Sequence, residues 1–286
     1  MKLRIVWGNG NRNADPVEPE PEPAPEPEAP GGLRVAALSD PGCHRELNED
    51  SVRVIEPEDA GLRSRKGLMA LVADGMGGHQ SGEVASALAA EVVSREYYAR
   101  EGSAPECLEG ALQAANREIF QQSASRQSLG GMGTTCTALV ILGDEAWAGH
   151  VGDSRVYLVR GGSIYRMTED HSAVMDLVKK GILSAEQARR HADRNVLLRA
   201  MGQREALEVE VWKESFPIRP GDRFVLCSDG LHDPVDDVEI QDAVLRLAPE
   251  AACAELVRLA RERGGYDNIT VVVLRADSTR ASEGDG

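Results

Sequence analysis

The sequence has no uninterrupted apolar run of the ~18 residues that a membrane-spanning helix needs. It also has no excess of basic residues, because 32 Lys and Arg face 47 Asp and Glu and give a net charge of −15 at pH 7. A charge of this sign makes nucleic acids and anionic membranes poor partners. We therefore expect a monomeric protein that binds neither nucleic acid nor membrane.

Paired cysteines are missing as well. The five cysteines are odd in number, lie far apart and form no CxxC pair, which argues against disulfides and against a structural zinc site. The first residues, MKLRIVW, have too short an apolar run for a secretory signal. We therefore predict reduced thiols and a cytoplasmic location, with Cys136 and Cys227 buried in apolar strands.

Nucleotide-binding motifs are incomplete. The segments GMGGHQ (75–80) and GMGTTC (131–136) lack the third glycine of G-x-G-x-x-G, and no P-loop Gly-Lys-Ser/Thr occurs. Asp74 directly precedes the first of these segments and would repel a pyrophosphate. No cysteine lies in a phosphate-binding loop, which argues against a thiol mechanism. These absences count against a dinucleotide-binding enzyme.

The chain divides by composition into three parts. Residues 15–30 alternate proline with glutamate and hold almost no apolar side chains, so they predict an extended tether rather than a core. We predict a disordered leader and linker over 1–32, a single large domain over 33–275 and a polar tail over 276–286.

Within the domain, short segments rich in Val, Ile and Leu alternate with turn residues and predict β-strands. Gly-Asp at 143–144 and Gly-Gly at 161–162 leave room only for hairpins, which require antiparallel pairing. Apolar periodicity predicts helices over 83–98 and 107–120, and a more polar helical stretch over 174–200. The pattern predicts an α+β fold. The predicted strands are 33–39, 51–57, 68–74, 136–144, 145–151, 154–160, 223–229 and 268–276.

Four aspartates stand at strand ends. Asp74 and Asp229 close apolar strands, while Asp50 and Asp267 open them. If the strands of each closing and opening pair are neighbours in an antiparallel sheet, the four carboxylates converge on one edge. Like charges within ~4–6 Å raise one another's pKa unless a cation joins them, and oxygen ligands favour Mg²⁺ or Mn²⁺.

Each aspartate taken alone has a plainer interpretation. Aspartates beside glycine are common turn residues, and we interpret those at 143–144 and 221–222, together with Asp233, in that way. Arg45 lies five residues before Asp50 and could grip a phosphoryl group through two hydrogen bonds. Glu46 and Glu49 lie close by, so a surface ion pair is the alternative for this arginine.

Eight motifs follow one another along the chain: HRELNEDS (44–51), VADGMGGHQSGEVAS (72–86), GMGTTCTALVI (131–141), GHVGDSRVYLVRGG (149–162), TEDHS (168–172), NVLLRAMG (195–202), LCSDGLHD (226–233) and GGYDNITVVVL (264–274). In this order they resemble the metal-dependent serine/threonine protein phosphatases, the 2C-type family, and most of all its bacterial branch. The resemblance covers about residues 33–275.

This resemblance implies a four-layer α-β-β-α sandwich of two antiparallel sheets flanked by helices, with metal ions at one edge. By matched position it implies Arg45 as the catalytic, phosphate-binding residue and residues 172–200 as a flap beside the site. It also implies a set of metal ligands for two or three Mn²⁺ or Mg²⁺ ions: Asp50, Asp74, the Gly75 carbonyl, Asp153, Asp229 and Asp267.

The implied reaction is hydrolysis of phosphoserine and phosphothreonine on proteins, by in-line attack of a water that bridges two metals. His79 is a candidate proton donor to the leaving alkoxide, with metal-bound water as the competitor. We expect Glu49 to hold metal-bound water. The implied partners are phosphorylated proteins, including an opposing Ser/Thr kinase and its substrates. Two alternatives stay open: a phosphatase dedicated to a phosphorylated transcription regulator, and a non-catalytic regulatory module of the same fold.

Overall fold

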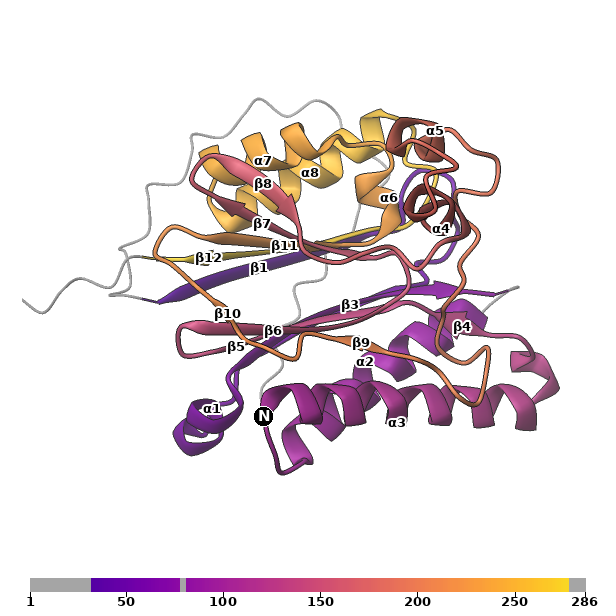
Figure 1. The fold of residues 1–286 in the computed structure, drawn as a ribbon, viewed down its shortest axis with the longest axis horizontal. Coiled ribbons are helices and arrows are strands. Elements are labelled where there is room, and N and C mark those ends of the chain that lie inside the picture. The colour runs from indigo at the N-terminus through magenta and orange to yellow at the C-terminus, as the bar shows by residue number, and fades with distance from the viewer. Residues whose placement is uncertain (1–31, 78–80, 278–286) are drawn as a thin grey trace, which may run out of the picture.

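Two antiparallel sheets lie face to face, and each is covered on its outer side by helices (Figure 1). The computed structural model of the chain describes residues 32–77 and 81–277. The first sheet contains, in spatial order, β1 (Leu33–Asp40), β12 (Ile269–Ala276), β11 (Arg223–Cys227), β7 (Arg155–Arg160) and β8 (Ser163–Arg166).

The second sheet has five strands in line and two short additions. Its ladder pairs are all antiparallel, as the short connections predict. The strands are β10 (Phe216–Pro217), β6 (Glu145–Val151), β5 (Cys136–Leu142), β3 (Leu68–Met76) and β2 (Asp50–Ile55), with β4 (Gly133–Thr134) beside β3 and β9 (Glu210–Val211) beside β6.

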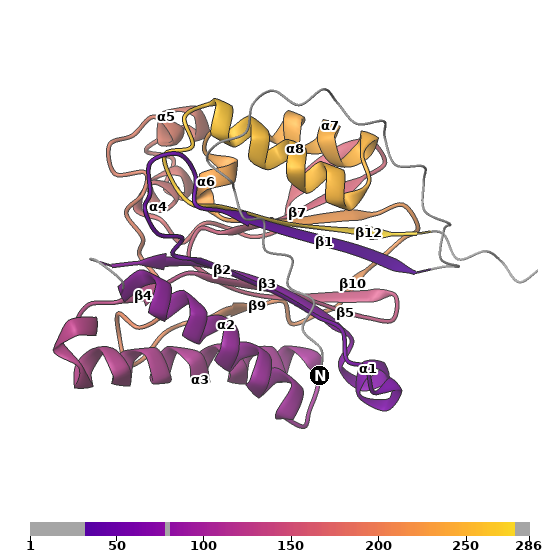
Figure 2. The same ribbon diagram turned by 180° about the vertical axis from the view of Figure 1, so that it is seen from behind.

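Two pairs of helices form the outer layers (Figures 1 and 2). The second sheet is covered by α2 (Ser81–Ala99) and α3 (Ala104–Ser125), and the first by α7 (Asp237–Arg246) and α8 (Pro249–Glu262). The remaining helical turns are α1 (Ala60–Lys66), η1 (Gln127–Leu129), α4 (Ala173–Lys179), α5 (Ala185–Arg189) and α6 (Asp229–His232).

The central strands are apolar on both faces because both faces are covered. In β12, Val271 and Val273 pack against the α7–α8 layer, whereas Val272 and Leu274 pack between the two sheets. This double burial explains why the strand is an almost unbroken run of aliphatic residues. The predicted α+β class and the four-layer sandwich are confirmed.

The helix predictions need correction. The stretch 174–200 is not one helix: α4 ends near Gly181, whose φ of +69° suits glycine, and α5 begins after Ser184. Periodicity also missed α7 and α8, which cover the outer face of the first sheet.

No helix in the described part of the chain combines the length and the apolar character needed to cross a membrane.

Candidate active site

Asp50 and Asp74 face each other across the β2–β3 ladder. They are directly opposed residues in the antiparallel register, so both carboxylates belong to the same edge of the second sheet. The backbone of Asp74 is fixed on both sides: its N–H donates to Thr135 Oγ1 at 2.9 Å, and its carbonyl accepts from the Thr134 hydroxyl at 2.8 Å. The expectation that these two strands are neighbours is confirmed.

Asp229 and Asp267 belong to the first sheet. β11 and β12 are antiparallel neighbours, and the chain leaves β11 two residues before Asp229 and enters β12 two residues after Asp267. The Ser228 hydroxyl donates to Asp50 Oδ2 at 2.7 Å and accepts from the Thr270 N–H at 3.0 Å. Ser228 therefore joins the two sheets at the edge where their aspartates meet.

The carboxyl of Asp50 lies in a buried, anionic environment. Burial raises its pKa to about 7, although hydrogen bonds from Thr270 and Ser228 act in the opposite direction. The charges of Asp229 and Asp267 raise the pKa further. Burial and nearby negative charge are the two physical causes that oppose ionisation of a carboxyl.

The other aspartates affect one another in the same way. Burial raises the pKa of Asp74 well above its usual range, and the charges of Asp229, Asp50, Asp153 and Asp267 add to the rise. The pKa values of Asp153 and Asp229 are raised as well, again first by burial. The five predicted aspartate ligands thus form one electrostatic cluster.

The cluster offers the kind of oxygen atoms that bind a divalent cation. Asp50 Oδ1 and Asp229 Oδ1 are buried and have no hydrogen-bond partner within the described chain, and such orphan acceptors are costly. Carboxylate oxygens are the donors that Mg²⁺ and Mn²⁺ prefer. Within residues 32–77 and 81–277, however, no three His, Cys, Asp or Glu side chains are already arranged as an assembled metal site.

Arg45 lies on the rim of this cluster. Its Nη2 donates to Asp267 Oδ2 at 2.8 Å, and both side chains are more than a third exposed. Asn268 organises the loop that carries Arg45: its amide nitrogen donates to the carbonyls of Pro41 and Leu47, and its Oδ1 accepts from the Glu49 N–H at 2.8 Å. The sequence reasoning assigned no role to Asn268, although it follows Asp267 in a family motif.

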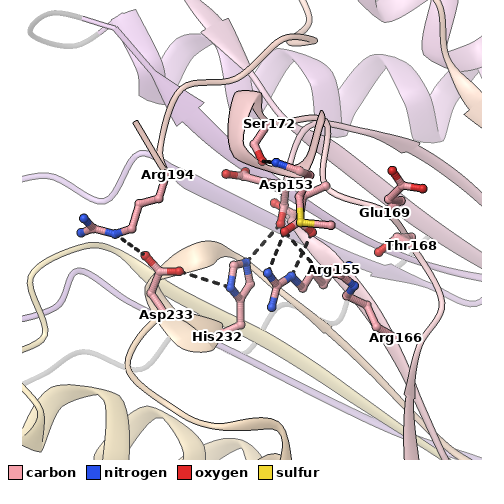
Figure 3. A network of polar contacts seen from close by, with 12 residues as sticks. Asp153, Arg155, Arg166, Thr168, Glu169, Ser172, Arg194, His232 and Asp233 are labelled. Atoms are coloured by element: carbon pink, nitrogen blue, oxygen red, sulfur yellow. Dashed lines mark hydrogen bonds and ion pairs between the residues drawn. The ribbon is translucent and has the colours of Figure 1, made fainter. Parts of the chain in front are cut away.

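A chain of polar contacts connects Asp153 to Arg194 (Figure 3). His232 Nε2 lies 3.1 Å from the Asp153 carbonyl, and His232 Nδ1 lies 3.5 Å from Asp233 Oδ1. Asp233 in turn lies 3.8 Å from Arg194, which comes from the predicted flap. The interpretation of Asp233 as a plain turn residue therefore missed a contact network behind Asp153.

A second arginine–aspartate pair holds the strand that follows Asp153. Arg155 donates from Nε and Nη2 to both carboxylate oxygens of Asp170 at 2.9 and 2.7 Å, and both side chains are largely buried. Burial opposes ionisation of Asp170, but the hydrogen bonds and charge of Arg155 lower its pKa overall. This bidentate pair fixes the position of the Asp153 loop.

Gly75 is required by close packing. A β-carbon at this position would lie 2.2 Å from the Gly82 carbonyl oxygen and 2.5 Å from the Glu49 carbonyl oxygen. A β-carbon at Gly82 would in turn meet the Glu49 carboxylate at 2.5 Å. Burial raises the pKa of that carboxyl. The glycine pair lets the start of α2 approach the end of β3.

The remaining predictions have mixed outcomes. Cys136 and Cys227 are fully buried strand residues, as predicted. The predicted flap, 172–200, contains α4 and α5 and lies on the same side of the molecule as α6 (Figures 1 and 2). His79 lies outside the described residues.

Residues 46–268 match the family described as protein phosphatase 2C. The serine/threonine protein phosphatase PstP of Mycobacterium tuberculosis is 41% identical over 242 residues, which are 84% of this chain and 44% of PstP. The chain thus spans less than half the length of that relative. Serine/threonine phosphatase stp of Listeria monocytogenes is 35% identical over 248 residues, covering 85% of this chain and 95% of stp.

The fold has close counterparts among solved structures. The catalytic domain of PstP in complex with two manganese ions has a TM-score of 0.73 and 36% identity, and the match covers 86% of this chain and 99% of that one. The family match includes more than two thirds of the sequence and all five clustered aspartates, with Asp267 near its end. The chain belongs to the protein phosphatase 2C family.

Proposed function

We propose that this protein hydrolyses phosphoserine and phosphothreonine monoesters on proteins with the help of divalent cations. The observation that carries the proposal is the cluster of aspartates beside an arginine on the rim, in which burial and neighbouring carboxylates raise the pKa values of Asp50, Asp74, Asp153 and Asp229. A site of this kind attracts cations and, through them, a phosphoryl group. The names of the relatives PstP and stp support the same reaction class.

The cations would be held by Asp50, Asp74, Asp229 and Asp267, with the Gly75 carbonyl and Asp153 completing a set for two or three ions. Bound Mn²⁺ or Mg²⁺ would acidify a water and offset charge on the phosphoryl oxygens. The orphan oxygens of Asp50 and Asp229 support this assignment. The two manganese ions in the related PstP structure favour Mn²⁺ as the first ion to test.

Arg45 would bind the phosphoryl group. Its guanidinium extends from an exposed loop, and Asp267 binds one of its nitrogens, while the others make no hydrogen bond within residues 32–77 and 81–277. A guanidinium can give two parallel hydrogen bonds to a phosphate, and these strengthen as charge develops on the oxygens. Arg45 therefore both orients the substrate and stabilises the transition state.

The substrates would be phosphorylated proteins, including an opposing Ser/Thr kinase and the proteins that it phosphorylates. We assign residues 1–32 to a tether outside the catalytic domain and place the protein in the cytoplasm. If the tether has no part in catalysis, removal of residues 1–31 leaves the turnover of a phosphopeptide unchanged. A change in kcat on truncation would contradict the assignment.

The deciding experiment is phosphate release from phosphoserine and phosphothreonine peptides by the purified full chain, with Mn²⁺ and with EDTA. We expect turnover with Mn²⁺ and none with EDTA. Asp229→Asn should abolish turnover, whereas Asp144→Asn, in the β5–β6 turn, should not. Activity that survives EDTA, or a purified protein that is inactive with every cation, would contradict the proposal; the second result would favour a non-catalytic module.

A further inference from the structure

A lysine and a cysteine are in contact away from the aspartate cluster. The Nζ of Lys66, the last residue of α1, lies 3.1 Å from the Sγ of Cys107 in α3. Cys107 is 1% exposed and Lys66 is 8% exposed. The pair is therefore buried, and Lys66 is the more exposed of the two residues.

The environment of Lys66 is unusual for an ammonium group. Lysines are almost never buried without an ionic partner, yet no carboxylate lies within ion-pair distance of Lys66 in the described part of the chain. Its Nζ stands 5.3 Å from the centre of the Tyr97 ring, a favourable cation–π distance. The one hydrogen-bond partner of Nζ among the described residues is the Cys107 sulfur.

Cys107 is the fourth residue of α3 and lies in the first turn of that helix. Its other close polar neighbour is the Arg100 carbonyl, at 3.7 Å from Sγ. The reactive form of a cysteine is the thiolate, and the structure places a cation beside this sulfur at contact distance. The two side chains thus present a nucleophilic sulfur and an amine that can combine after oxidation.

We propose that Lys66 and Cys107 form a site of oxidative modification, in which hydrogen peroxide couples Nζ to Sγ through a reversible nitrogen–sulfur bond. The thiolate attacks one peroxide oxygen, so that an S–O bond forms, the O–O bond breaks and hydroxide leaves. Sulfur is oxidised by two electrons and the peroxide is reduced, giving a sulfenic acid.

The second step closes the bond between the two side chains. The released hydroxide takes a proton from the Lys66 ammonium, and the free amine attacks the sulfur. The N–S bond forms and the S–O bond breaks, and the oxygen leaves as water with a second proton from the nitrogen. In sum, one thiolate, one ammonium and one peroxide give the coupled product and two waters. Sulfenic acids condense with backbone nitrogen in the same manner.

The product ties the end of α1 to the first turn of α3 and closes a loop between residues 41 positions apart. A cross-link of this kind restricts the unfolded chain, so the melting temperature should rise by about 5–10 °C. Lys66 precedes β3 at the end opposite Asp74, roughly 25 Å along the strand, and α1 and α6 lie at opposite ends of the molecule (Figure 1). The modification therefore acts on stability and not on the aspartate cluster.

The test uses the full chain carrying Cys43→Ser, because Cys43 is the exposed cysteine. The protein is treated with hydrogen peroxide, digested and analysed by mass spectrometry. We expect a linked peptide containing Lys66 and Cys107 that is lighter than the two separate peptides by two hydrogen atoms. Trypsin should fail to cut after Lys66, and a thiol reductant should restore both peptides and the original melting temperature.

Lys66→Arg is the matched control, because it keeps the positive charge but not the nucleophilic amine. In this variant Cys107 should stop at the sulfenic acid, which dimedone traps, and no linked peptide should form. Two results would overturn the proposal: oxidation of Cys107 in the Lys66 protein without a linked peptide, or a Cys107 that stays reduced under peroxide that fully oxidises Cys43 in the unsubstituted chain.

Discussion

The hydroxyl of Ser228 donates a 2.7 Å hydrogen bond to the carboxylate of Asp50, and the two residues lie 178 positions apart in the sequence. Ser228 directly precedes Asp229 after β11, whereas Asp50 opens β2. This one hydrogen bond thus holds the aspartates of one sheet close to those of the other.

Asp229→Asn should separate activity from stability. The amide keeps the shape but removes a buried negative charge, so the metal-free protein should gain about 1–3 kcal/mol in its free energy of unfolding. Phosphatase activity should fall by at least about 10²-fold because a proposed ligand is lost. Denaturant unfolding in EDTA and phosphopeptide assays in Mn²⁺ measure the two effects. A variant that is less stable in EDTA and fully active in Mn²⁺ would contradict the assignment of Asp229 to a cation-binding cluster.

Arg45→Ala should lower kcat/KM by about 10²–10³-fold, since it removes the donors proposed to hold the phosphoryl group. Arg45→Lys should recover only part of this loss, because an ammonium cannot form two parallel hydrogen bonds. Steady-state kinetics on one phosphopeptide measure both values. Arg95→Ala, on the exposed side of α2, is the control; an equal loss there would discount a specific role for Arg45.

Mn²⁺ should stabilise the folded protein at neutral pH. A ligand at 100 times its Kd adds about 2.7 kcal/mol, which corresponds to a rise in melting temperature of about 5–10 °C for a domain of this size. Thermal unfolding in EDTA and in increasing Mn²⁺ measures the rise. In Asp50→Asn the rise should shrink. An unchanged melting temperature at every Mn²⁺ concentration would argue against cation binding in the cluster.

Gly75→Ala should destabilise the protein by about 3 kcal/mol, because the new methyl group would lie 2.2 Å from a backbone oxygen in α2. Gly130→Ala is the matched control: its φ is −59° and its nearest neighbour would be 3.3 Å away. That substitution should change the free energy of unfolding by no more than about 0.5 kcal/mol. Urea unfolding of both variants decides the matter, and equal effects would show that the β3–α2 contact is not tight.

His150 should make the protein sensitive to acid. Burial, and then the charge of nearby His171, lower its pKa from 6.5 to about 3. The unfolded chain therefore binds a proton that the folded chain excludes between those two pKa values. The free energy of unfolding contributed by this group is complete above pH 6.5 and falls by up to about 1.4 kcal/mol per pH unit as the pH drops toward 3.

The polar neighbours of the His150 side chain suggest a substitution that tests whether the folded protein keeps this imidazole neutral. Thr137 Oγ1 lies 2.8 Å from Nδ1, the Glu169 carbonyl lies 3.0 Å from Nε2, and Asp170 and Glu210 contribute negative charge. His150→Gln keeps polar partners but cannot titrate. Its stability should fall less steeply between pH 6 and pH 4 than that of the parent chain, whatever its stability at pH 7; parallel pH profiles would refute the assignment.

Local sequence patterns predicted the strands well because each strand is a short apolar run bounded by turn residues. All eight predicted strands exist, and the hairpins at Gly143 and Gly161 form as expected. The helical layer over the first sheet was missed even though local signals were present. Asp236 and Glu239 form a capping box at the start of α7, and Pro249 opens α8. The division of 174–200 was also marked by Gly181 and by the Ser184–Gln187 capping box.

The sequence by itself determined the alternation of strands, the aspartates at strand ends and the ordered motifs that resemble one phosphatase family, because each is a property of a few consecutive residues. Only the tertiary structure decided which distant residues meet. It placed Ser228 on Asp50, Gly82 against Gly75 and Lys66 on Cys107. Such contacts depend on how the two sheets and their helices pack, and no local pattern encodes that geometry.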